Sequence, residues 1–339
     1  MHNMHLKKYA FFSFLIILSV GLFVYSQIGS KYTLEFFGIP VTLSVAFWVV
    51  LPMILLFIGS YLHMAYYSFI NYLKIKKYKK DYDKVINSFF SSILREPRQN
   101  NYKTQELRNI GSVIDRSYIV IKEFNFDYKE DLIRKAVQYV KDIQRGEFVD
   151  IKEINLSPTN PIFQKNLENR MKEEPTYSGV ILRKCDEFGR ELCKKALNIF
   201  ITYAEISKIK DYAKHFDKES LFNLLKIAKD KNKDLNLNIS DLIYILQESK
   251  ISMESKEYIE LAKEVKELYL PDERLRLFEQ LKEIDEKAEE AFVYTLFDLE
   301  MIDKAKDELE NSEEFEFLRF KAFLELKECG KNYPLELFV

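Results

Sequence analysis

Two uncharged stretches near the N-terminus decide the fold: YAFFSFLIILSVGLFVYSQI at Tyr9–Ile28 and PVTLSVAFWVVLPMILLFIGSYLHMAYYSFINYL at Pro40–Leu73. A helix of about 20 residues spans about 30 Å, which is the thickness of the hydrocarbon core of a bilayer. The second stretch is longer than one crossing requires, so we expect its end to emerge into the interface, where tyrosines are frequent. The sequence therefore predicts two membrane-spanning helices, at residues 9–28 and 40–61.

Basic residues flank this pair of spans on one side. Lys7 and Lys8 precede the first span, the short loop between the spans holds only Lys31 and Glu35, and five lysines follow the second span: Lys74, Lys76, Lys77, Lys79 and Lys80. The positive-inside rule then predicts a multi-pass protein of the bacterial inner (cytoplasmic) membrane, with both termini in the cytoplasm. Lysines at this depth attract anionic lipid headgroups by about 1 kcal/mol each, so membrane lipids are the partners predicted for the five lysines. A role as topology signals alone is the simpler interpretation.

Charge divides the chain sharply. Residues 1–80 have a net charge of +7 and residues 81–339 a net charge of −9. An acidic domain repels phosphates, so nucleic acid is not an expected partner. The three cysteines, Cys185, Cys193 and Cys329, are an odd number and form no CxxC pair, which argues against a disulfide framework and favours a reducing cytoplasm.

The soluble part has a helical pattern throughout. With 9 Gly and 8 Pro in 339 residues, the chain has few of the residues that sheets and tight turns require. Residues 81–150 are predicted to form a helical stalk and linker region, whose first segment, before Pro97, continues the second span, and Pro158, Pro161 and Pro175 mark a boundary. The predicted fold is all-α: a transmembrane hairpin at 1–80, then a cytoplasmic, solenoid-like array of helical hairpins at 151–339. Its helices are expected at 180–203, 205–216, 219–230, 240–249, 254–269, 272–284, 287–299, 301–310 and 314–328.

Two family resemblances follow from particular residues. Residues 8–80 resemble the two-span domain of the lipopolysaccharide assembly protein A (LapA) family, at Thr33, Leu34, Phe36, Gly38, Val41–Leu43 and Gly59. The resemblance implies a short loop of β-like alternation between the spans and an assembly or quality-control role without catalysis. Residues 288–326, with Ala305 followed by Leu309, weakly resemble tetratricopeptide-type repeats, which implies a protein-binding surface.

Motifs for catalysis are missing from the sequence. No G-x-x-x-x-G-K-[ST] or G-x-G-x-x-G phosphate loop occurs. His215 is the one histidine of the soluble part, and Cys185 could pair with it, but no oxyanion-type glycine loop accompanies them. Inert buried thiols on one helix face are the favoured interpretation of Cys185 and Cys193. We therefore expect no catalytic residues and no enzymatic activity.

One loop has the spacing of a calcium site. DKNKDLNLNISD at residues 230–241 places five oxygen donors at positions 1, 3, 5, 7 and 12 of an EF-hand loop: Asp230, Asn232, Asp234, Asn236 and Asp241. Leu235 stands where the turn requires Gly, and Asp241 replaces the usual bidentate Glu. A polar connection between two helices is the alternative, and apart from this Ca²⁺ no cofactor is expected.

These features favour a non-enzymatic inner-membrane scaffold or adaptor that presents a helical protein-binding domain in the cytoplasm, in envelope (lipopolysaccharide) assembly or its regulation. An accessory part of a larger membrane machine, such as a flagellar motor or secretion system, is the alternative. A membrane-tethered enzyme is the third hypothesis, and it requires a cleft that contains His215 or clustered carboxylates.

Overall fold

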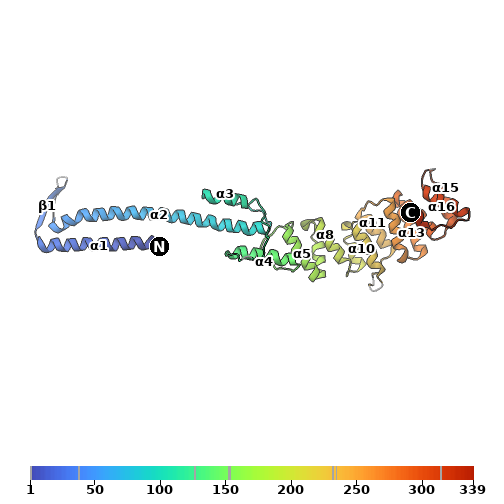
Figure 1. The fold of residues 1–339 in the computed structure, drawn as a ribbon, viewed down its shortest axis with the longest axis horizontal. Coiled ribbons are helices and arrows are strands. Elements are labelled where there is room, and N and C mark those ends of the chain that lie inside the picture. Colours follow the sequence, from blue (N-terminus) through green and yellow to red (C-terminus); the bar gives the residue numbers. More distant parts are fainter. Residues whose placement is uncertain are drawn as a thin grey trace. The chain divides into compact units, whose positions relative to one another are not determined.

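The computed structural model describes residues 2–36, 39–125, 127–151, 154–230, 233, 235–313 and 315–339. Over these residues the chain is helical apart from one two-stranded sheet, so the predicted all-α class is confirmed (Figure 1). The chain divides into two compact units, residues 1–136 and 137–339. Helix α4 (Asp131–Arg145) crosses the division, and the domain boundary that the prolines predict at residue 150 falls within the second unit.

The first unit begins with a helical hairpin. Helices α1 (His2–Gln27) and α2 (Val45–Ile93) lie side by side and are joined by the antiparallel strands β1 (Lys31–Phe36) and β2 (Ile39–Ser44) (Figure 1). The strands pair from Lys31 opposite Ser44 to Phe36 opposite Ile39. The Trp48 indole N–H donates to the Tyr32 carbonyl at 3.1 Å and ties the sheet to the start of α2. The β-like loop between the spans is therefore a β-hairpin.

The second predicted span begins too early at residue 40. Residues 40–44 belong to β2, and Ser44 caps α2 by accepting a hydrogen bond from the Phe47 backbone N–H. Pro40 lacks an N–H donor, which a strand at the edge of a sheet tolerates and a helix interior does not. From Val45 the helix runs 49 residues to Ile93, so the helix that contains the second apolar stretch continues through the first part of the predicted stalk and ends there.

The surfaces of α1 and of the first part of α2 are apolar. Phe12, Leu22 and Leu56 are each more than 60% exposed, which would be costly in water over so large a surface. Both helices are long and apolar enough to cross a membrane, over Lys7–Gln27 and within Val45–Ile93. The helix α3 (Gln105–Ile114) then packs on the polar end of α2 around Val85, Leu107 and Ile114.

The second unit contains short helices around one continuous apolar core, which extends from Leu167 to Leu335. Its helices after α4 are α5 (Pro161–Glu173), α6 (Ser178–Leu182), α7 (Cys185–Phe188), α8 (Arg190–Phe200), α9 (Ile206–Lys210), α10 (Lys218–Lys229), α11 (Ile239–Ser249), α12 (Ser255–Glu264), α13 (Pro271–Ile284), α14 (Glu289–Asp298), α15 (Ile302–Glu310) and α16 (Leu318–Glu328). Short 3-10 turns complete it: η1 (Pro175–Tyr177), η2 (Ala213–His215), η3 (Val265–Glu267), η4 (Glu286–Ala288) and η5 (Leu335–Phe338).

Most of the helices predicted in this unit are confirmed, and two are not continuous. The predicted helix 180–203 is three helices, and Gly189, whose φ of +82° no helix interior accepts, separates the second from the third. The predicted helix 205–216 is the short helix α9 followed by the 3-10 turn η2. Asp217 caps α10, and Pro271 is the first residue of α13. Asn238 caps α11, because its side chain accepts the Asp241 backbone N–H at 2.8 Å.

Candidate functional site

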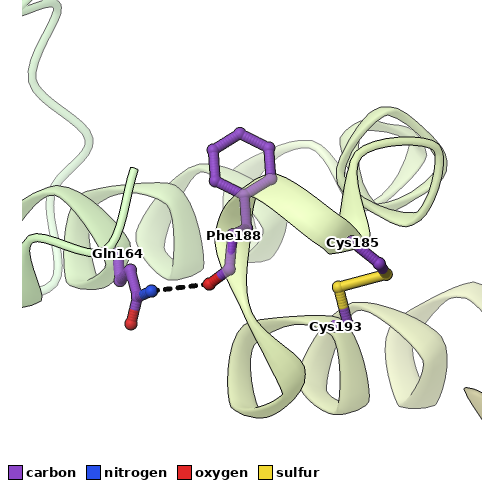
Figure 2. The surroundings of a disulfide bond; sticks show 4 residues. All are labelled: Gln164, Cys185, Phe188 and Cys193. Carbon is purple, nitrogen blue, oxygen red and sulfur yellow. Dashed lines mark hydrogen bonds between the residues drawn. A yellow bond between two sulfur atoms is a disulfide. The ribbon is translucent and has the colours of Figure 1, made fainter. Parts of the chain in front are cut away.

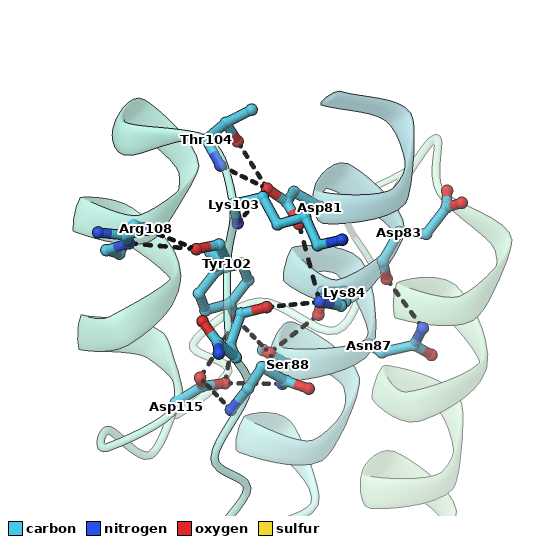
Figure 3. A network of polar contacts seen from close by, with 12 residues as sticks. Asp81, Asp83, Lys84, Asn87, Ser88, Tyr102, Lys103, Thr104, Arg108 and Asp115 are labelled. Carbon is cyan, nitrogen blue, oxygen red and sulfur yellow. Dashed lines mark hydrogen bonds and ion pairs between the residues drawn. The ribbon is translucent and has the colours of Figure 1, made fainter. Parts of the chain in front are cut away.

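A network of polar side chains fastens α3 to α2, and we call it the polar clamp. Its members are Asp81, Ser88, Asn100, Tyr102 and Asp115 (Figure 3). Asp81 and Ser88 come from α2, just beyond its five lysines, whereas Asn100 and Tyr102 lie in the connection to α3 and Asp115 directly follows α3. The clamp therefore holds two segments against the helix that continues the second apolar stretch.

Asp81 anchors one end of the clamp. Its carboxylate is buried and accepts the backbone N–H groups of Lys103 and Thr104, each at 2.7 Å, and the Thr104 hydroxyl at 2.9 Å (Figure 3). Burial by itself would raise the pKa of Asp81, but these hydrogen bonds and the Lys84 ammonium at 3.8 Å lower the pKa below its ordinary value. The carboxylate therefore stays charged in the folded protein.

Tyr102 occupies the centre of the clamp. Its hydroxyl lies 2.9 Å from Ser88 Oγ and 3.2 Å from both carboxylate oxygens of Asp115. Burial, followed by the Asp115 charge, raises the pKa of Tyr102, so the phenol stays protonated and acts as a hydrogen-bond donor. The ring packs on Gly111 of α3, where a Cβ atom would stand 2.3 Å from Tyr102 Cζ. The close approach of α3 thus requires glycine at position 111.

The chemistry of the clamp is structural. Each charged member is engaged by hydrogen bonds, and Asn100 completes the network by donating from its side chain to Ser88 Oγ at 2.9 Å and to Asp115 Oδ1 at 3.1 Å. Such a satisfied network specifies one packing arrangement and leaves no reactive group free. Sequence reasoning missed the clamp. The available signals were Asp81, the first acidic residue after the lysines, and Gly111 in a chain with few glycines.

A second feature is a groove of about 700 Å³ in the C-terminal part of the second unit, which we call the acidic groove. Six of its lining residues are glutamates: Glu286, Glu289, Glu290, Glu308, Glu313 and Glu316. Its two lysines are engaged, because Lys282 pairs with Glu308 at 2.9 Å and Lys287 pairs with Glu254 at 2.8 Å. The groove therefore has an excess of negative charge.

The acidic groove is also lined by apolar side chains. Phe292 and Val293 are buried beneath it, and Lys282 Nζ lies 4.1 Å from the centroid of the Phe292 ring. Phe317 also lines the groove, and two residues close to it in the sequence, Phe315 and Leu318, are 81% and 55% exposed. Negative charge beside exposed apolar side chains is the surface chemistry that complements a basic, amphipathic segment.

The predicted calcium loop stays a prediction. Asn232 and Asp234 lie outside the described residues, so the set of five donors cannot be assembled from the structure. Asp241 lies in the first turn of α11, is buried and pairs with Lys210 Nζ at 2.5 Å. Among the described residues no group of three or more His, Cys, Asp or Glu side chains could hold a metal ion.

The cysteine prediction is wrong. Cys185 and Cys193 are joined by a disulfide, and they come from two helices, α7 and α8, rather than from one helix face (Figure 2). The turn at Gly189 brings their Cα atoms to 5.6 Å, which is within the usual range for a disulfide. His215 is half-buried, and burial followed by the neighbouring Lys214 charge lowers its pKa. In the oxidised chain Cys185 therefore offers no thiol to His215.

The five lysines predicted to contact lipid all lie on α2 and are exposed. No family model, no curated protein and no solved structure matches the chain. The structure itself defines the class: a helical protein with two candidate membrane-spanning helices and a second, helical unit with its own core.

Proposed function

We propose that this chain is a non-enzymatic scaffold of the bacterial inner membrane, which presents a helical protein-binding unit at the cytoplasmic face. The observation that carries the proposal is the single helix α2, which contains a candidate span, the exposed lysines and the attachment point of the polar clamp. One continuous helix gives a rigid connection between a membrane anchor and the segments that follow it. By the positive-inside rule, the lysines support a cytoplasmic location for that connection.

Helix packing in the second unit supports a protein-binding role. Several helices pack on the next helix but one, namely α10 on α12, α11 on α13 and α12 on α14. This pattern is typical of stacked helical hairpins, whose surfaces form extended binding grooves. We therefore propose a solenoid-like arrangement with the acidic groove as its docking surface. The partner segment would be basic and amphipathic, with lysines or arginines for the glutamates and an apolar side chain for Phe315 and Leu318.

Envelope assembly is the process we propose, and the resemblance of residues 8–80 to the lipopolysaccharide assembly protein A family supports it. The proposed partners are membrane lipids, at Lys74, Lys76, Lys77, Lys79 and Lys80 of α2, and one protein, at the acidic groove. A flagellar-motor or secretion-system subunit bound at the groove would instead favour an accessory role in such a machine.

Site-specific photo-crosslinking in native membranes tests the docking surface. A photoreactive residue in place of Asn311, which lines the groove, should give a discrete crosslinked product that mass spectrometry identifies. Neutralising the groove with Glu286→Gln and Glu289→Gln should reduce the yield of that product several-fold, because no ion pair engages either carboxylate among the described residues.

The matched control neutralises two exposed glutamates outside the groove, with Glu248→Gln and Glu260→Gln. This variant has the same net charge as the groove variant and should keep the full crosslinking yield. An equal loss of crosslinking yield in both variants would show that the effect depends on net charge alone. The absence of a crosslinked product from position 311 would exclude the groove as the docking surface.

A further inference from the structure

The turn that contains the disulfide is also stabilised by contacts that do not involve sulfur. Cys185 begins α7, Cys193 lies in α8, and the two are eight residues apart in the sequence (Figure 2). The Gln164 side chain donates to the Phe188 carbonyl at 2.7 Å, and the ring of Phe163 lies beside that of Phe188 at 6.3 Å. These contacts hold α7 on α5 whether or not the sulfurs are bonded. The reduced turn should therefore keep its two thiols close together.

Solvent access differs between the two sulfur-bearing residues. Cys193 is 2% exposed and belongs to the continuous core, between Leu192 and Ala196 on α8. Cys185 is only partly buried, and its chain neighbours Lys184 and Asp186 are exposed. Because exchange requires direct attack on a sulfur atom, a thiol in solution reaches Cys185 first.

We propose that Cys185 and Cys193 form a reversible redox modification site, at which Cys185 exchanges with glutathione and Cys193 acts as the resolving cysteine. In the oxidising direction the Cys185 thiolate attacks glutathione disulfide, forms a mixed disulfide and releases one glutathione thiolate. The Cys193 thiolate then attacks Cys185 Sγ, forms the intramolecular bond and releases the second glutathione thiolate. Overall, two protein thiols and one glutathione disulfide become one protein disulfide and two glutathione thiols.

The predicted compartment of this unit determines which kind of disulfide is expected in it. A permanent structural disulfide is rare in a reducing cytoplasm, where disulfides are usually transient and sense the redox state. The lysine flanks predict the cytoplasm for this unit, so a reversible bond is the form that fits both observations. The inference rests on the proposed cytoplasmic location of this unit and is independent of the acidic groove and of any protein partner.

Titration with glutathione tests the inference on the full-length chain in membranes. Cys329 is free and exposed, so Cys329→Ser is introduced to leave only the pair for counting. After equilibration at a series of ratios of reduced to oxidised glutathione, the sample is quenched with acid, denatured and alkylated with a polyethylene-glycol maleimide. We expect two adducts at the reducing end, none at the oxidising end, and the same midpoint from either direction. No adducts at any ratio, or two adducts at every ratio, would overturn the proposal.

Two variants test the assigned roles of the cysteines. With Cys193→Ser, oxidised glutathione should leave a stable mixed disulfide on Cys185, visible as glutathione mass on the intact protein. With Cys185→Ser, Cys193 should stay unmodified until denaturant is added. If circular dichroism shows that either variant is unfolded, a second experiment replaces that variant. The reduced Cys329→Ser protein is alkylated briefly and its peptides are mapped, and Cys185 should be labelled before Cys193. Labelling of Cys193 first would overturn the assignment.

Discussion

At the scale of single residues, Gly111 is a position where the structure accepts no side chain. A Cβ atom there would stand 2.3 Å from Tyr102 Cζ and 2.7 Å from its hydroxyl, with Tyr102 itself 2% exposed and unable to move outward. Gly111→Ala should therefore destabilise the packing of α3 on α2 by about 1–3 kcal/mol, in spite of the higher helix propensity of alanine. Hydrogen exchange of residues 105–114 measures the effect locally. Gly59→Ala, at an open position of α2, is the control and should leave that exchange unchanged.

Asp81 gives the clamp a dependence on pH. Its pKa is lower in the folded chain than in the unfolded chain, so its contribution to stability is complete above the ordinary aspartate pKa of about 3.9. That contribution decreases as the pH falls through the lowered value, because protonation removes the charged acceptor of three hydrogen bonds. We expect hydrogen exchange in residues 100–114, corrected for its intrinsic pH dependence, to accelerate below about pH 4.

Asp81→Asn should show faster exchange at neutral pH and a weaker acid response. Some response should remain, because Asp115 also has a lowered pKa in the same clamp: burial raises it, but hydrogen bonds from Ser88 and Asn100 more than offset that effect. An acid response identical in the two proteins would show that Asp81 does not control the clamp.

At the scale of elements, α2 combines a candidate span and a polar stalk in one helix. Lys74, Lys76, Lys77, Lys79 and Lys80 are exposed and follow directly on the apolar part. Replacing all five with glutamine should reduce the enrichment of anionic lipid around the protein, since each lysine near the surface contributes about 1 kcal/mol of attraction. The amount of anionic lipid that stays bound to the protein purified from mixed-lipid vesicles, quantified by mass spectrometry, measures that enrichment.

Replacement of the same lysines with arginine is the matched control, because it preserves the charge. The arginine variant should retain the enrichment, and high salt should reduce it in the parent protein. Equal enrichment in the glutamine and arginine variants would leave the lysines as topology signals alone.

At the scale of the whole molecule, the topology is the feature on which the proposed function depends. A reporter fused after Val339 that is active only in the cytoplasm should show activity, and a periplasmic reporter at the same position should not. Moving positive charge into the β-hairpin loop while neutralising the five lysines should reduce this bias. A periplasmic C-terminus in the parent protein would contradict both the scaffold proposal and the compartment assumed for the cysteine pair.

The sequence by itself determined the features that repeat along the chain. Runs of apolar residues without charge predicted the two long helices, and periodic apolar positions predicted α10, α11 and α13 closely, because both signals are local and involve many residues. The lack of Gly and Pro likewise predicted the all-α class.

Only the tertiary structure decided the features that join distant residues. Asp81 meets the Thr104 backbone, Gly111 meets the Tyr102 ring, and Cys185 meets Cys193 across a turn that one left-handed glycine creates. Each pairing depends on where the chain folds back, and a helix-period pattern contains no information on that geometry. The same reason explains why the acidic groove could not be predicted: its glutamates belong to different helices and turns, and only their packing places them around one hollow.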